Sequence, residues 1–131
     1  MKERKLEDKE KNVLCVSNSY TKKFFLNPEY NNIPENIKRE LKIMCVLFTE
    51  DVGGVIELYF TEDGDVRIGT MKDKDDFDYD YIGSELKVNE MKKEKLELFE
   101  SLKLYYRVVK LGISPEQAAC ELENDFGNDD E

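Results

Sequence analysis

The sequence contains no histidine. It therefore lacks Ser-His-Asp and Cys-His catalytic groups, imidazole metal ligands and the usual general base near neutral pH. Its three cysteines, Cys15, Cys45 and Cys120, are widely spaced and form no CxxC pair. A disulfide framework and a zinc ribbon are both poor interpretations, and reduced thiols of a cytoplasmic protein fit better. The sequence offers no cofactor or metal motif, so we expect neither.

Long apolar runs are also missing. No run reaches the roughly 18 residues of a membrane-spanning helix, and the first residues lack the apolar stretch of a secretory signal. Lysine and arginine form no cluster in a chain of net charge -10. Nucleic acid and anionic membranes are therefore not expected partners, and the expected location is the cytoplasm.

The acidic charge is concentrated in two places. Residues 73–80 carry five aspartates and one lysine, and residues 121–131 carry six acids and no base. Residues 1–12 mix five basic and four acidic groups without periodicity, as expected for a flexible lead-in. We expect one domain over residues 13–123, followed by an acidic disordered tail at 124–131.

The most apolar stretch of helical length is residues 34–54, PENIKRELKIMCVLFTEDVGG. Pro34 suits the start of a helix, and Gly53-Gly54 suits its end. Apolar residues follow helical spacing in one stripe: Ile37, Leu41, Met44, Cys45 and Phe48. Three more, Ile43, Val46 and Leu47, predict that the second half is buried on nearly all sides.

Two β-hairpins flank this central helix. Apolar runs at 12–18 and 22–26 predict the first hairpin. Runs at 55–60 and 66–71 on either side of Asp63-Gly64 predict the second, with a two-residue turn. Residues 77–81 alternate aromatic and acidic side chains, which predicts a further edge strand.

Two helices follow. Residues 84–111, ended by Gly112, predict a long helix of about 42 Å. A domain of this size has a radius of gyration of about 14 Å, so the helix should break near 84–90 or its polar end should project. A capping box at residues 114–117 predicts a short helix to about Glu123. The predicted fold class is α+β: two hairpins and the extra edge strand, packed on a central and a long second helix, with a short C-terminal helix.

Three stretches carry a family resemblance: residues 24–30 (FFLNPEY), 37–54 (IKRELKIMCVLFTEDVGG) and 102–109 (LKLYYRVV). Together they resemble a family of small bacterial proteins of unknown function, over roughly residues 13–111. The most specific part is the KIMCVLFTEDVGG stretch. The resemblance implies a single cytoplasmic domain with a variable tail, and it implies no particular chemistry.

Thr49-Glu50-Asp51 breaks a local rule, because two carboxylates lie at the negative end of the central helix dipole. One interpretation is structural: Asp51 caps amides of the Gly53-Gly54 turn, and Glu50 is simply exposed. The other is functional: these residues contact a cation or a partner.

Asp76, Asp78 and Asp80 would line one face of the predicted edge strand. Their spacing fails the EF-hand template, because the sixth and twelfth positions counted from Asp76 are Tyr81 and Lys87. Three interpretations stay open: a solvated edge strand, a weak divalent-ion site and a contact with a basic partner.

These features favour a non-catalytic protein-interaction module. It would bind an unidentified protein, or form a homodimer through the long helix. The alternative is a small carboxylate-based or divalent-metal-dependent enzyme or binding site around Glu50 and Asp51.

Overall fold

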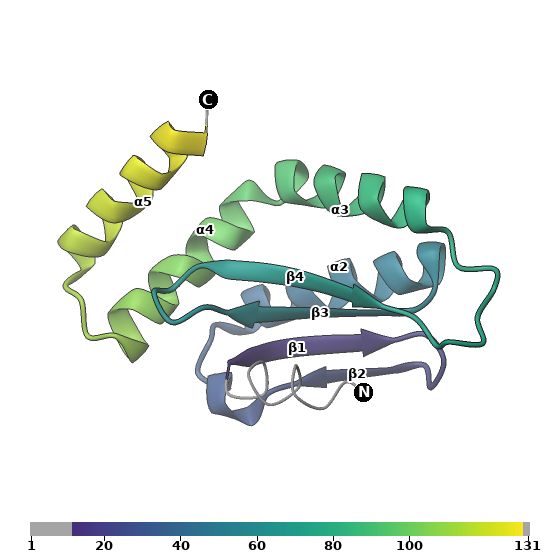
Figure 1. Cartoon of the computed structure of the whole chain (residues 1–131). Helices are drawn as coiled ribbons and strands as arrows, with labels where there is room; N and C mark the ends of the chain where they lie inside the picture. Colours follow the sequence, from purple (N-terminus) through teal and green to yellow (C-terminus); the bar gives the residue numbers. More distant parts are fainter. Residues whose placement is uncertain (1–11, 130–131) are drawn as a thin grey trace.

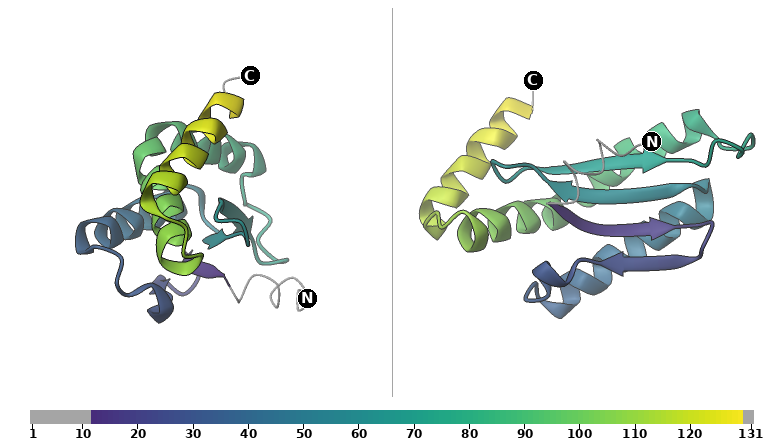
Figure 2. Two further views of the ribbon diagram at one scale, coloured as in Figure 1. Left: turned by 90° about the vertical axis from the view of Figure 1, so that its left-hand side faces the viewer. Right: turned by 60° about the horizontal axis from the view of Figure 1, so that its bottom comes forward.

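The structure, a computed structural model, describes the backbone of residues 12–129 and the side chains of residues 12–123. Four strands form one antiparallel sheet in the order β2-β1-β3-β4. They are β1 (Val13–Asn18), β2 (Lys23–Leu26), β3 (Val55–Phe60) and β4 (Val66–Met71). The described helices α2, α3 and α4 lie on one face of this sheet (Figure 1, Figure 2). The predicted α+β class is confirmed.

Both predicted hairpins are present, and pairing of β1 with β3 joins them into a single sheet. The second turn is longer than the two residues predicted, because it spans residues 61–65. Thr61 closes this loop: its amide donates to the Asp65 carbonyl at 2.8 Å, and its hydroxyl accepts from the Asp65 amide at 2.9 Å. These bonds stabilise a five-residue loop in which Gly64 has a φ of 90°.

The central helix is α2 (Glu35–Val52), preceded by Pro34 and ended by two glycines as predicted. Gly54 has a φ of 73°, and a Cβ atom there would lie 2.6 Å from the Met71 carbonyl oxygen. The position therefore demands glycine for both its backbone conformation and its close approach to β4.

The prediction that the second half of α2 is buried on nearly all sides is wrong. The buried residues form one stripe: Leu41, Met44, Cys45, Phe48 and Thr49. Ile43 and Leu47 are 52% and 59% exposed. The sheet covers only one side of α2, so this extra apolar surface stays in contact with solvent.

Short side chains bring α2 close to β1. The Cys15 and Cys45 sulfurs lie 4.0 Å apart, and the Ser17 and Thr49 hydroxyls form a 2.9 Å hydrogen bond. All four residues are buried. Contact with Cys45 and then burial raise the pKa of Cys15 well above its ordinary value, so this thiol stays protonated.

The extra edge strand predicted at 77–81 is wrong. Residues 73–80 form turns, and Tyr81 begins α3 (Tyr81–Glu94). Aspartate side chains accept local amide hydrogens here: Asp76 from Asp78 at 3.2 Å, and Asp80 from Gly83 at 2.9 Å. Such local bonds replace the backbone ladder that a strand would need.

The single long helix predicted at 84–111 is also wrong. It divides at Lys95, which has φ -110° and ψ 34°, into α3 and α4 (Leu96–Tyr105). A π-helical turn, η2 (Tyr106–Lys110), continues α4. The break lies farther along the chain than the expected 84–90, and it keeps both halves beside the sheet (Figure 1).

The last helix is α5 (Pro115–Asp129), which projects away from the sheet in Figure 1. The Ser114 hydroxyl accepts the Gln117 amide at 3.2 Å, as the capping box predicts. Helical backbone continues past the end predicted near Glu123. The predicted flexible lead-in, residues 1–12, lies outside the described residues except for residue 12. The side chains of the predicted disordered tail, residues 124–131, lie outside them as well. The flexible lead-in and the disordered tail therefore stay predictions.

None of the helices in the described part of the chain combines the length and the apolar character that a membrane crossing requires.

Aromatic side chains lock the end of β3 to the other elements. The Phe60 ring stacks on Tyr106 at 4.5 Å between centroids and contacts Tyr30 at 5.2 Å. Tyr30 belongs to a 3₁₀ turn, η1 (Pro28–Tyr30), and also meets Tyr105 edge-on. Segments far apart in the sequence therefore share one buried cluster.

We expect Phe60→Ala to lower the free energy of unfolding by about 3–5 kcal/mol, because it empties this cluster. Phe25→Ala is the matched control: Phe25 also lies on a strand but is 51% exposed, so its loss should cost less than about 1 kcal/mol. Urea denaturation monitored by circular dichroism measures both. Equal losses would contradict the role given to the aromatic cluster.

Candidate functional site

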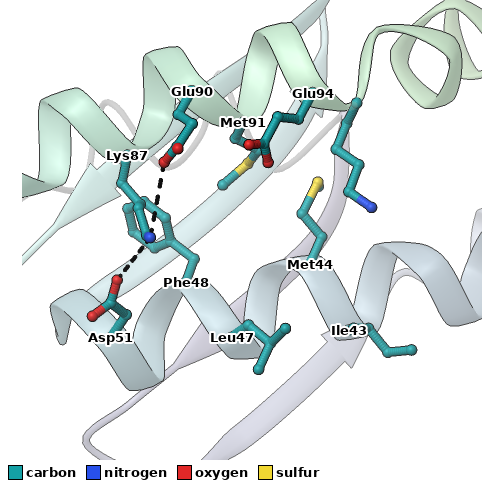
Figure 3. A pocket seen from close by; sticks show the side chains of 10 residues that line it. Ile43, Met44, Leu47, Phe48, Asp51, Lys87, Glu90, Met91 and Glu94 are labelled. Atoms are coloured by element: carbon teal, nitrogen blue, oxygen red, sulfur yellow. Dashed lines mark ion pairs between the residues drawn. The ribbon is translucent and has the colours of Figure 1, made fainter.

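An apolar groove of about 380 Å³ lies between α2 and α3. Met44 and Phe48 of α2 and Met91 of α3 lie between the two helices (Figure 3). These three side chains are almost completely buried. Ile43 and Leu47 extend the apolar lining outward from α2, where both are more than half exposed. The groove therefore has a buried apolar floor and an exposed apolar wall.

Ion pairs join the two helices at both ends of the groove. The Lys87 ammonium lies 3.0 Å from Asp51 and 3.9 Å from Glu90, as Figure 3 shows. At the other end Lys95 lies 3.4 Å from Glu40. Glu40 and Asp51 are eleven residues apart on α2, so the two pairs are separated by about 16 Å along the helix axis.

Asp51 perturbs the titration of its partner. Its hydrogen bond and charge, followed by the charge of Glu90, raise the pKa of Lys87. Lys87 is therefore charged at neutral pH. Because the folded-state pKa is raised, this contribution to stability is lost as the pH rises through the pKa of Lys87.

Few side chains hold α3 in place. Only Ser84 and Met91 of α3 are buried, whereas the shorter α4 buries Leu98, Phe99 and Leu102. Ser84 is fixed by the Tyr79 hydroxyl at 2.7 Å. Since Met91 is the one large apolar side chain of α3 that is buried, α3 leaves the adjacent wall of α2 uncovered.

The structure gives different surroundings to the three residues that the sequence suggests as a site, Thr49, Glu50 and Asp51. Thr49 is buried against β1, where its hydroxyl also contacts the carbonyls of Cys45 and Val46. Glu50 is exposed. The Gly53 amide donates to the Thr49 carbonyl at 2.8 Å, and Asp51 instead pairs with Lys87 at the end of the groove.

The aspartates of residues 73–80 organise their own loop. Asp76 accepts the Tyr20 hydroxyl at 2.6 Å, which ties the loop to the β1–β2 turn. Asp80 caps the N-terminus of α3, and Asp78 is exposed. Within residues 12–123, no group of three His, Cys, Asp or Glu side chains is arranged to hold a metal ion.

A second apolar hollow, about 520 Å³, lies between the start of α2 and the end of α4. Its lining includes Ile37, Tyr105 and Val109 and contains no charged side chain. Charged side chains line the groove between α2 and α3 instead, so that groove is the better candidate for orienting a bound ligand.

Most of the groove is not evident from the sequence. The helical pattern predicts that Ile43 and Leu47 are buried, but they lie outside the buried stripe of α2 and form an exposed apolar face. Met91 lies seven residues before Leu98 in an apolar row of the predicted long helix, but this spacing does not identify its partners on α2. Lys87 carries no local signal, because its partner Asp51 lies thirty-six residues earlier in the chain.

Comparison with known proteins gives one match. The model of a family of unknown function (DUF6145) matches residues 11–114. No curated protein and no solved structure matches the chain. The matched region contains both helices of the groove and ends just before α5. The predicted resemblance to a family of unknown function is confirmed, whereas its bacterial distribution stays a prediction.

We expect Asp51→Asn to shift the titration of Lys87 to lower pH, because the substitution removes the largest cause of the raised pKa. NMR titration of the Lys87 side-chain Cε resonance measures the shift. Glu97→Gln, an exposed carboxylate of α4 outside the groove, is the control and should leave the midpoint unchanged. An unchanged midpoint in Asp51→Asn would contradict the ion pair.

Proposed function

The chain belongs to the DUF6145 family of unknown function, and from its groove we propose that it is a non-catalytic protein-interaction module. The module binds an apolar helical segment of another protein between α2 and α3. The observation that carries the proposal is the exposure of Ile43 and Leu47 beside a floor of buried Met44, Phe48 and Met91. Apolar side chains that remain exposed together commonly mark an interaction site.

The dimensions of the groove suit a helix. About 16 Å separates the two flanking ion pairs, which corresponds to three turns of an α-helix. An amphipathic helix that enters a groove places apolar side chains at i, i+3, i+4 and i+7. Met44 and Met91 supply flexible, polarizable side chains that adapt to such a face.

Charge favours a different protein over a second copy of this chain. The net charge is -10, so two copies repel each other at long range. Three carboxylates, Asp51, Glu90 and Glu94, line the groove and would meet like charges across a symmetric contact. A homodimer is therefore the weaker form of the proposal, and sedimentation velocity distinguishes it from a monomer.

The enzymatic alternative has less support. Asp51 is engaged by Lys87, Glu50 is exposed, and no group of three His, Cys, Asp or Glu side chains among residues 12–123 is arranged to hold a metal ion. We also propose a cytoplasmic location. Cys120 is an exposed free thiol, which suits a reducing compartment.

A display library of helical peptides tests the proposal. The library fixes apolar residues at i, i+3, i+4 and i+7 and randomises the remaining positions. Peptides selected on the native protein should bind Leu47→Glu at least about tenfold more weakly, because the substitution places a charge on the apolar wall. Leu111→Glu is the matched control, since Leu111 is 40% exposed outside the groove.

Fluorescence anisotropy of the labelled peptides gives the affinities, and circular dichroism confirms that both variants fold. Selection of no binder, or equal weakening by Leu47→Glu and Leu111→Glu, would refute the groove as the binding site.

A further inference from the structure

We infer that the segment bound in the groove is a basic amphipathic helix, with lysine or arginine beside its apolar face at both ends of the groove. The inference rests on the proposed function and specifies the chemistry of the partner. It follows from how the charges around the groove are distributed and which of them are already paired.

Carboxylates outnumber cations around the groove. Its lining holds Asp51, Glu90 and Glu94 against two lysines, Lys87 and Lys95. Both lysines already have carboxylate partners. Lys87 lies between Asp51 and Glu90, and Lys95 pairs with a further acid, Glu40. The rim is therefore negative after its internal ion pairs are formed.

Glu94 is the carboxylate best placed for a partner. Figure 3 shows it on the groove side of α3, close to Met91. Among the residues with described side chains, none forms an ion pair with it. When the apolar stripe of a docked helix covers Met91, a lysine or arginine that flanks the stripe would meet the Glu94 carboxylate.

The end of α2 adds a second negative region. Glu50 and Asp51 both lie in its last turn, which contains no basic residue. The helix dipole places further negative charge there, so the position favours a cation. Lys87 neutralises Asp51 from α3, whereas Glu50 stays exposed. A cation supplied by the partner would compensate Glu50 at this end of the groove, as another would pair with Glu94 at the opposite end.

Three synthetic peptides with one apolar face test the inference. Each is about twelve residues long, and the positions that flank the apolar stripe are all lysine, all glutamine or all glutamate. At low salt we expect the lysine peptide to bind about 3- to 10-fold more tightly than the glutamine peptide, and the glutamate peptide to bind most weakly. High salt should reduce these differences.

The double substitution Glu50→Gln and Glu94→Gln should remove most of the preference for lysine. Glu97→Gln, an exposed acid outside the groove, should leave it unchanged.

The outcomes separate this inference from the proposed function. If the three peptides bind equally and each is weakened by Leu47→Glu, the groove is a docking site and the basic partner is wrong. Tighter binding of the glutamate peptide also refutes it. If no peptide binding responds to Leu47→Glu, the proposed function itself fails.

Discussion

The close contact between α2 and β1 determines how the rest of the molecule is arranged. The short side chains Cys15 and Ser17 of β1 meet Cys45 and Thr49 of α2, so the helix lies close against the sheet. This contact fixes the rotation of α2 about its own axis, because only one stripe can face the strand. The same rotation turns Leu47 away from the sheet. The groove therefore exists because the apolar surface of α2 extends beyond the side that the sheet covers.

Local signals made much of the fold predictable from the sequence. The β-hairpins, the ends of α2 and the start of α5 follow from alternation, glycine pairs and a capping box, which act over a few residues. The errors arose where tertiary contacts decide. Lys95 is a good helix former, yet the helix breaks there as it follows the sheet. Residues 77–81 alternate like a strand, but Tyr81 begins α3, and hydrogen bonds such as Tyr20 to Asp76 hold residues 73–80 as a loop.

The candidate site was only partly predictable. The sequence marks Asp51 as a candidate because a carboxylate at the negative end of a helix is unfavourable. In the structure Asp51 pairs with Lys87 beside the groove. Thr49 and Asp80, which the sequence also suggested, are explained by packing and capping. The contacts of Met91 and Lys87 with α2 could not be predicted, because the pattern of one helix does not show which residues of another it meets. The matched family region, residues 11–114, contains both helices of the groove and ends before α5.

The proposed binding of a helix in the groove requires that the apolar wall of α2, formed by Ile43 and Leu47, is open to solvent in the free protein. Relaxation of methyl NMR signals by a soluble paramagnetic nitroxide measures this exposure directly. We expect strong broadening of the Ile43 and Leu47 methyl signals and little effect on Leu41, which is fully buried on the same helix. Protection of Ile43 and Leu47 to the level of Leu41 would mean that α3 or a second copy already covers the wall, and it would contradict an open groove that receives a partner.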